Sequence, residues 1–424
     1  MMKKAIIVLV LFTLALAGCS TGSSSQSGQV ELEFYFPVAV GGPITKIVDD
    51  MVAEFHEQHE DIKVTPIFAG SYAETMTKVL TAVQGNNSPD LGVLFSIDLH
   101  TLLSLDAIEK LNPHFEQSYL NDFFPGFMSN SQIGEDVWSI PFQRSTIVLY
   151  YNKDAFREAG LDPEQPPTNW DELLAYSEQL TENGRWGLEI PSTGYQYWMF
   201  QALALQASGG QNIMSADGTE VYFDTPENLE ALEFYVDLGS KHNVMPQGII
   251  EWATVPSDFI SGNTAMMFHT TGNLTRVKEE ADFEFGVAYL PAKKDHGTPT
   301  GGGNIYMFKD IPDENKEAAV KFIEFLTEPA RVAQWSMDTG YVATRQSAYD
   351  TDELQSYVDE FPEAKVALDQ LEYADSELST FENGRVQKIL NDALQAALTG
   401  SISPEEALKR AQNEADEVLK SYQD

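Results

Sequence analysis

Cysteine is almost absent from the sequence, since Cys19 is the only one among 424 residues. No disulfide can form within the chain, and a metal site would have only this one thiolate available. His56 and His59 stand three positions apart, whereas the metal-binding histidines of a zincin helix stand four apart so that both face one ion. This spacing favours a solvated helix face, and we expect neither a metal site nor a cofactor.

Positive charge is also scarce. The chain has 26 Lys and Arg residues against 65 Asp and Glu residues, which gives a formal net charge of -39. Adjacent basic residues occur only at Lys3-Lys4, Lys293-Lys294 and Lys409-Arg410, so no basic stripe could follow a phosphate backbone. We therefore exclude a nucleic-acid partner. The same acidity disfavours anionic ligands and anionic lipid, unless a cation inside a cleft overrides it locally.

The common motifs of catalysis are missing. No Gly-x-Ser-x-Gly elbow occurs in residues 30–424, and the glycine-rich residues 300–304 lack the Lys-Ser/Thr ending of a phosphate-binding loop. These glycines fit either a nest of N–H groups for an anion or a close approach of the backbone to a ligand or a neighbouring strand. Abundant carboxylates and an aromatic content of 11% would suit a glycosidase, but sequence alone cannot place two carboxyls at a catalytic separation. We expect that the protein is not an enzyme.

The start of the chain carries a secretory signal. Two lysines precede residues 5–17, an apolar run that is too short to span a bilayer of roughly 30 Å. Leu-Ala-Gly-Cys at residues 16–19 is typical of a lipobox, in which the cysteine is acylated and becomes the new N-terminus. We predict a signal peptide over residues 1–18, lipidation at Cys19 and a Ser/Gly-rich tether over residues 19–29. The alternative is an ordinary signal peptide with a chance cysteine.

Strands and helices alternate along the first part of the mature chain. Alternating apolar and acidic residues predict a strand at 30–36, and residues 62–68 and 90–95 are typical of two more strands. A helix is expected over residues 73–83, and another precedes the second strand. Its apolar face carries Ile47, Val48, Met51, Val52 and Phe55. This βαβαβ order predicts a parallel sheet covered by helices.

A second region of strands and helices begins near Tyr150. Thr168, Thr225 before Pro226, and Ser403 in Ser-Pro-Glu-Glu are predicted N-caps of three helices. A further helix has an apolar stripe made of Ala319, Phe322, Ile323 and Leu326. The sequence therefore predicts two α/β lobes with a helical C-terminal part.

Three segments carry a resemblance to a known family. They are residues 141–146 (Pro-Phe-Gln-Arg-Ser-Thr), 149–156 (Leu-Tyr-Tyr-Asn-Lys-Asp-Ala-Phe) and 160–170 (Gly-Leu-Asp-Pro-Glu-Gln-Pro-Pro-Thr-Asn-Trp). The sequence resembles family 1 extracellular solute-binding proteins of bacterial ABC importers, and within them binders of sn-glycerol-3-phosphate.

The resemblance implies a two-lobed, periplasmic-binding-protein-like α/β fold of type II. Each lobe would be a sheet flanked by helices, and a multi-segment hinge would join the lobes around a ligand cleft. Residues 30–140 and 274–329 are expected to form lobe 1, and residues 141–273 and 330–424 to form lobe 2.

The resemblance also implies which residues face the ligand. The matching positions are Tyr72, Ser145, Tyr195, Trp198, Thr270, Gly302 and Tyr341. Ser96 stands where glycerol-phosphate binders have a cleft glutamate, and the arginine expected near residues 379–385 is out of register, with Arg385 only nearby. The resemblance therefore supports the fold more strongly than it supports glycerol-3-phosphate as the ligand.

The chemistry of these side chains points to a hydroxylated ligand. Aromatic faces stack on the C–H patches of sugars and polyols, which suits Tyr195, Trp198 and Tyr341, although core packing is the alternative for such residues. Other side chains suit hydrogen bonding to hydroxyls: Tyr72, Ser96, Asp98, Ser145, Thr270 and Asn304.

Arg144 has three alternative roles. Its guanidinium could hold phosphate or carboxylate bidentately, clamp a sugar hydroxyl beside Asp98, or form a salt bridge at the hinge.

We therefore predict a lipid-anchored, monomeric binding protein in the cell envelope, on the outer side of the cytoplasmic membrane or in the periplasm. It would capture a small polar solute and deliver it to the transmembrane subunits of an ABC permease. A sugar or oligosaccharide is the first hypothesis for the solute, and sn-glycerol-3-phosphate or a glycerophosphodiester is the second. A lipoprotein glycosidase and an adhesin or structural lipoprotein are alternatives of other classes.

Overall fold

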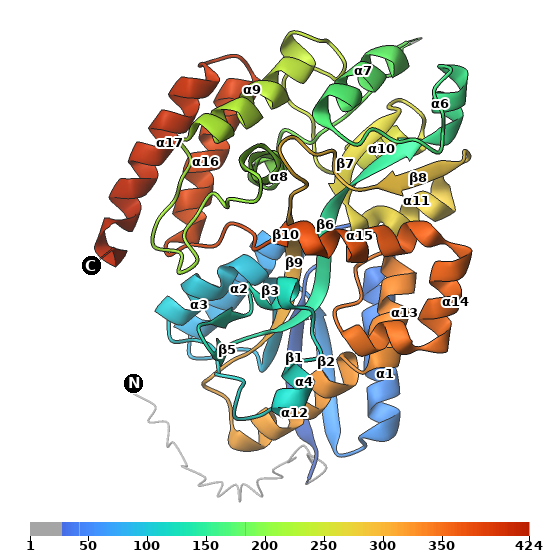
Figure 1. The fold of residues 1–424 in the computed structure, drawn as a ribbon. Coiled ribbons are helices and arrows are strands. Elements are labelled where there is room, and N and C mark those ends of the chain that lie inside the picture. Colours follow the sequence, from blue (N-terminus) through green and yellow to red (C-terminus); the bar gives the residue numbers. More distant parts are fainter. Residues whose placement is uncertain (1–27, 42, 183, 424) are drawn as a thin grey trace, which may run out of the picture.

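The structure is a computed structural model that describes residues 28–41, 43–182 and 184–423. The predicted signal peptide, Cys19 and most of the predicted tether lie outside these residues. Two lobes lie one above the other in Figure 1, and strands β6 (Ile140–Asn152) and β9 (Thr298–Met307) run through both. The predicted two-lobed α/β fold is confirmed.

The first lobe is built on the predicted βαβαβ unit. Its elements are β1 (Val30–Phe36), α1 (Ile44–Gln58), β2 (Ile62–Phe68), α2 (Tyr72–Gln84) and β3 (Leu91–Phe95). Strand β1 pairs in parallel with both β2 and β3, as predicted. Strand β3 then pairs antiparallel with β9, which links this sheet to the strands between the lobes.

Helices bury apolar stripes against this sheet. Helix α1 buries Val48, Val52 and Phe55 at the spacing expected of one helix face. Helix α12 (Asp313–Leu326) buries its predicted stripe, and the Phe322 ring lies 4.9 Å from that of Phe55. A complete capping box between Ser71 and Glu74 fixes the first residue of α2, which is the predicted site residue Tyr72.

Strands β6 and β9 connect the lobes. All 13 residues of β6 are buried; its first half pairs with β9, and its second half pairs with β7 (Met266–Thr270) and β8 (Phe285–Ala288). The main sheet therefore has the strand order β2-β1-β3-β9-β6-β7. Side chains on one face of β6 point into the gap between the lobes, and those on the other face point away from it.

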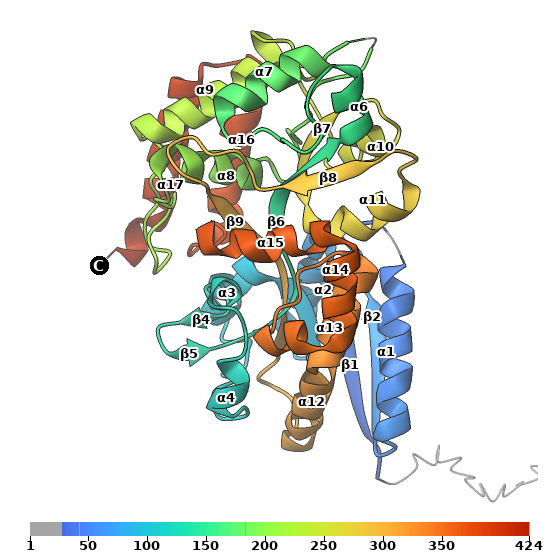
Figure 2. The same ribbon diagram turned by 45° about the vertical axis from the view of Figure 1, so that its right-hand side comes forward.

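The second lobe is mostly helical around α8 (Gln196–Ser208), every residue of which is buried. Figure 2 shows α8 beneath α9 and beside α16, with α17 on the outer side. The other helices of this lobe are α6 (Lys153–Glu158), α7 (Trp170–Leu180), α9 (Pro226–Ser240), α10 (Val255–Ile260), α11 (Leu274–Glu280), α16 (Asn383–Leu398) and α17 (Pro404–Leu419).

Short elements complete the described fold. They are α3 (Leu99–Ser104), α4 (Gln117–Leu120), α5 (Pro125–Met128), β4 (Gln132–Ile133), β5 (Asp136–Val137), α13 (Pro329–Thr339), α14 (Asp352–Glu360), α15 (Val366–Asp369) and β10 (Ala374–Asp375). Among the described helices, none combines the length and the apolar character that crossing a bilayer requires.

Three details bear on the sequence-based expectations. The N-cap of α7 is Asn169 rather than Thr168, because the Asn169 side chain accepts the N–H of Glu172. Residues 274–288 pack with the second lobe, since Leu274 and Val277 belong to its core and β8 pairs with β6. Trp335 of α13 belongs instead to the core of the first lobe. The boundaries expected at 274 and 330 stay a prediction.

Candidate ligand-binding site

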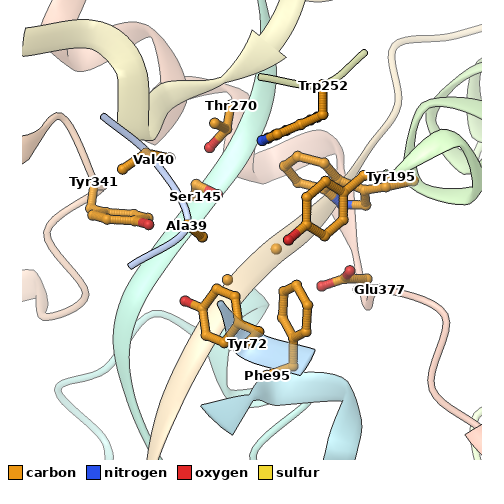
Figure 3. Close-up of a pocket in the computed structure, with 13 residues that line it drawn as sticks. Ala39, Val40, Tyr72, Phe95, Ser145, Tyr195, Trp252, Thr270, Tyr341 and Glu377 are labelled. Carbon is orange, nitrogen blue, oxygen red and sulfur yellow. The ribbon is translucent and has the colours of Figure 1, made fainter. Parts of the chain in front are cut away.

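A cavity of about 350 Å³, counted with its open mouth, lies between the lobes. Both lobes and the connecting strands contribute side chains to it (Figure 3). The lining residues are Ala39, Val40, Tyr72, Phe95, Ser145, Tyr195, Trp198, Trp252, Thr270, Gly301, Gly302, Tyr341 and Glu377.

The glycine tract of β9 brings aromatic rings directly against the backbone. A Cβ on Gly301 would lie 2.3 Å from Cζ2 of Trp198, and a Cβ on Gly303 would lie 2.7 Å from the Tyr72 ring. Real Cβ atoms do not approach other atoms so closely, so both positions require glycine. The tract belongs to the strand and pairs with β6 and β3. Close approach of the backbone to its neighbours therefore explains the glycines.

Gly302 is required for a different reason. Its φ is +97°, a conformation that favours glycine, and a Cβ there would lie 1.9 Å from the carbonyl oxygen of Gln143 on β6. Beside it, the Trp198 indole N–H donates to the carbonyl oxygen of Thr300 at 3.1 Å. Strand β9 thus fixes both the place and the tilt of this ring.

Aromatic rings form a continuous wall of the cavity. Tyr72 stacks on Phe95 with ring centroids 4.0 Å apart, and Phe95 meets the edge of Tyr195 at 5.8 Å. Tyr195 in turn contacts Trp252 at 4.5 Å, and Trp252 lies 6.1 Å from Trp198. Because the first two rings come from one lobe and the others from the second, the wall spans the gap.

A buried histidine holds Trp252 in this wall. The ring of His269 lies 3.8 Å from that of Trp252, and Nε2 is 3.1 Å from the Trp252 carbonyl oxygen. The Asn273 amide donates to Nδ1 at 2.9 Å, so the proton of the neutral ring is on Nε2, which donates to Trp252. Burial lowers the pKa of His269 to about 3, which keeps the ring neutral.

Hydroxyl groups supply polar contacts at the other side of the cavity. Tyr72 donates to Oε1 of Gln143 at 2.9 Å, and burial holds the pKa of Tyr72 well above its usual value. Ser145 and Thr270 are each 3% exposed and line the cavity from β6 and from the end of β7. The Tyr341 hydroxyl points toward the middle of the cavity in Figure 3.

Glu377 is the one acidic residue among those that line the cavity, and no sequence pattern pointed to it. The residue is 1% exposed, and its backbone is fixed by two hydrogen bonds with the Asn130 side chain at 3.0 and 3.1 Å. Its Oε1 accepts the Tyr197 hydroxyl at 2.5 Å, whereas Oε2 has no partner among the described residues. Burial raises the pKa of this carboxyl to about 8, against an opposing effect of Arg144.

Arg144 does not line the cavity. It neighbours Ser145 on β6 and therefore projects from the opposite face. Its guanidinium donates to Thr300 Oγ1 at 3.0 Å, to the Gly302 carbonyl at 3.2 Å and to Asn304 Oδ1 at 3.4 Å. It forms no salt bridge within residues 28–41, 43–182 and 184–423. Arg144 thus joins β6 to β9 and has none of the three expected roles.

Three further predicted residues also lie outside the cavity. Asn304 faces the same side as Arg144 and donates to Ser139 at 2.9 Å and to Ser131 at 3.0 Å. Ser96 is fully buried. Asp98 lines a neighbouring, larger pocket of about 980 Å³ that shares Tyr72, Phe95 and Tyr195 with the cavity, and burial raises the pKa of Asp98 to about 7.

The other seven predicted residues come together around one cavity. They are Tyr72, Ser145, Tyr195, Trp198, Thr270, Gly302 and Tyr341. Six lining residues were not expected from the sequence: Ala39, Val40, Phe95, Trp252, Gly301 and Glu377. Phe95 ends a predicted strand and Trp252 is a tryptophan in a segment between helices, and both positions could have pointed to a site.

Comparison with known proteins shows the family to which the chain belongs. Residues 50–363 match the family described as bacterial extracellular solute-binding protein. The sn-glycerol-3-phosphate-binding periplasmic protein UgpB of Salmonella typhimurium is 28% identical over 408 residues, which cover 90% of this chain and 91% of that protein.

Two solved structures share the fold. The cyclic alpha-maltosyl-1,6-maltose binding protein from Arthrobacter globiformis has a TM-score of 0.80 and 26% identity, with coverage of 93% of this chain and 100% of that one. UgpB from Mycobacterium tuberculosis in complex with glycerophosphocholine has a TM-score of 0.82 and 24% identity, with the same coverage. Family membership confirms the expectation of a protein that is not an enzyme. The chain belongs to the bacterial extracellular solute-binding proteins, which bind solutes for ABC importers and have no catalytic role.

Proposed function

We propose that the protein captures a small hydroxyl-rich solute, a sugar or an oligosaccharide, in the cavity between its lobes and delivers it to an ABC permease. The observation that carries this proposal is the aromatic wall, to which both lobes contribute rings. Such rings stack on the C–H faces of sugars, and the hydroxyls of Ser145, Thr270 and Tyr341 are placed to replace water around the solute.

The charges at the cavity disfavour glycerol-3-phosphate relative to a sugar. None of the described residues that line it is Lys, Arg or His, and Glu377 adds a carboxyl. The buried Arg144 guanidinium donates to β9 on the opposite face of β6. A phosphate would lose its hydration without gaining a cationic partner, which is costly in a buried site. Glycerol-3-phosphate or a glycerophosphodiester is the second candidate, since the curated relatives carry that name.

The solute would stabilise a closed arrangement of the lobes. Tyr72 and Phe95 belong to the first lobe, whereas Tyr195 and Trp252 belong to the second, so a bound ring contacts both only when they are close. We infer hinge motion at the strands that join the lobes, which are β6 and β9.

We also propose that Cys19 anchors the protein to the outer side of the cytoplasmic membrane, as a monomer. The support is the apolar run and the Leu-Ala-Gly-Cys sequence at residues 16–19. Metabolic labelling with a palmitate analogue should mark the protein, and Cys19→Ser should move it from the membrane fraction to the soluble fraction. Unchanged fractionation of Cys19→Ser would contradict the anchor.

A thermal-shift screen tests the proposed function. Sugars, polyols and glycerol phosphates are added at low and at high salt, and a ligand raises the melting temperature in proportion to ln(1 + [L]/Kd). We expect neutral saccharides to stabilise the protein regardless of salt, and Trp252→Ala to remove the effect. Tyr222→Ala is the matched control, because Tyr222 is 41% exposed and outside the cavity. Stabilisation by phosphates alone would support the second candidate, and no response to any small molecule would refute solute capture.

A further inference from the structure

Resting on the proposed function, we propose that the solute carries a positively charged nitrogen on its hydroxylated skeleton, and that Glu377 is the residue that selects for this charge. The cavity combines a wall of aromatic rings with one buried carboxyl and no basic side chain among its described lining residues. This combination recognises an organic cation, such as a quaternary ammonium or a protonated amino group.

The carboxyl of Glu377 lies beside the aromatic rings of the cavity. In Figure 3 the Glu377 side chain points into the space bordered by Phe95, Tyr72 and Tyr195. Oε1 is occupied by the Tyr197 hydroxyl at 2.5 Å, and Oε2 lacks a partner among the described residues although it is fully buried. Leaving a buried carboxylate oxygen unpaired is unfavourable, so the site is completed by a proton or by a cation.

The rings around the carboxyl also suit a cation. The faces of Trp, Tyr and Phe rings carry partial negative charge and attract ammonium groups, most strongly where water is excluded. Trp198 and Tyr72 are 4% and 2% exposed, so they offer such dry surfaces. A neutral sugar uses only their apolar contact, whereas a cation also gains from their electrostatic attraction and from the carboxylate.

The charged and titratable groups that interact electrostatically with Glu377 determine how binding depends on pH. They are Tyr197 from α8, Arg144 from β6, Asp98 from the turn after β3, Tyr72 from α2 and Tyr195, the residue before α8. The Arg144 guanidinium is engaged by Thr300 and Gly302, so it does not pair with the carboxyl. Burial raises the pKa of Glu377 to about 8, and a bound cation favours the ionised form. Cation binding therefore releases a proton below pH 8, and the affinity rises with pH up to that value, by at most about tenfold per unit.

Matched pairs of probes test the proposal by titration calorimetry. Choline, which is a cation at every pH, is compared with its neutral isostere 3,3-dimethyl-1-butanol. Glucosamine, whose amino group is protonated at pH 6 and largely neutral at pH 8, is compared with N-acetylglucosamine. The titrations use the purified protein at pH 6 and pH 8 in 0.5 M salt, which screens the long-range field of the acidic surface. We expect at least one cation to bind at least tenfold tighter than its neutral partner at pH 8, with a smaller ratio at pH 6.

Two variants separate charge recognition from folding. Glu377→Gln keeps the size of the side chain and should abolish the preference for the cation, while a neutral probe still binds. Glu372→Gln, an exposed residue five positions earlier, should retain the preference. Equal affinities within both pairs at pH 8, or a preference that survives Glu377→Gln, would overturn the inference. If saccharides bind and neither cation does, the inference fails while solute capture stands; if nothing binds, both fail.

Discussion

Replacing Gly301 by alanine should displace the Trp198 ring, which lines the cavity and packs against strand β9. The added methyl carbon would lie 2.3 Å from Cζ2 of Trp198, and ordinary contact starts at 3.4 Å, so the ring must move by about 1.1 Å, the difference between these distances. The φ of Gly301 is not in the left-handed region, so the penalty is one of contact rather than of backbone strain. Overpacking of a buried site costs about 1–3 kcal/mol of unfolding free energy.

The same displacement should weaken ligand binding. A shifted Trp198 loses its hydrogen bond to Thr300 and its contact with the solute, and an aromatic contact is worth about 0.5–1.5 kcal/mol, or roughly 2- to 13-fold in Kd. Urea unfolding and calorimetry with the best-bound solute from the screen measure the two effects. Gly384→Ala in α16 is the control, because its Cβ would meet nothing within 4 Å and alanine is a better helix former.

A second substitution makes the test specific. Trp198→Phe removes the indole atoms that face Gly301, so the double variant should recover part of the stability that Gly301→Ala loses relative to its own Trp198→Phe background. The close-approach explanation would be refuted if Gly301→Ala matched Gly384→Ala in stability and affinity, or if the two losses in the double variant were simply additive.

Two other substitutions test residues that we expect to affect stability rather than ligand binding. Arg144→Ala should lower the unfolding free energy by roughly 3 kcal/mol, because the buried Thr300 and Asn304 side chains lose their hydrogen-bond donor. The same variant should change the solute Kd by less than about threefold. Lost binding at unchanged stability in urea would contradict this. His269 has a pKa lowered to about 3 by burial, below the unfolded value, so its contribution to stability is full above about pH 6.5 and declines as pH falls. Between pH 7 and pH 5 the wild type should therefore lose about 2 kcal/mol more than His269→Gln, and equal losses would show that the ring is not held neutral.

Sequence patterns predicted the strands and helix caps that depend on interactions between residues close in the sequence. Strands β1 and β2 begin and end at the predicted residues, since alternation of apolar and polar side chains marks a half-buried strand. Thr225 caps α9 as predicted. The error at Thr168 arose because two good capping residues are adjacent, and only the geometry of the turn decides that Asn169 reaches Glu172.

For the candidate site, too, some residues could be identified from the sequence and others could not. The seven cavity residues came from a resemblance to a family, not from any local pattern. Arg144 was misplaced because its role was judged by chemistry alone, although the two-residue period of a strand puts Arg144 and Ser145 on opposite faces. Glu377 lies between β10 and α16, where no periodicity exists, and its approach to the rings depends on long-range contacts with Asn130 and Tyr197.

The negative charge of the whole chain and the carboxyl in the cavity both favour binding of a cationic solute. A formal charge of -39 concentrates cations near the surface and speeds their encounter with a cleft, and salt screens this effect within about 10 Å at 0.1 M. The association rate of a cationic solute should therefore fall steeply as salt rises from about 10 to 300 mM, while that of a neutral saccharide stays constant. Stopped-flow tryptophan fluorescence with Trp252 in the aromatic wall can follow both. Because Glu377→Gln changes one charge among many, it should alter dissociation and leave this salt dependence of association intact; loss of the dependence in that variant would assign the steering to the cavity itself and not to the surface.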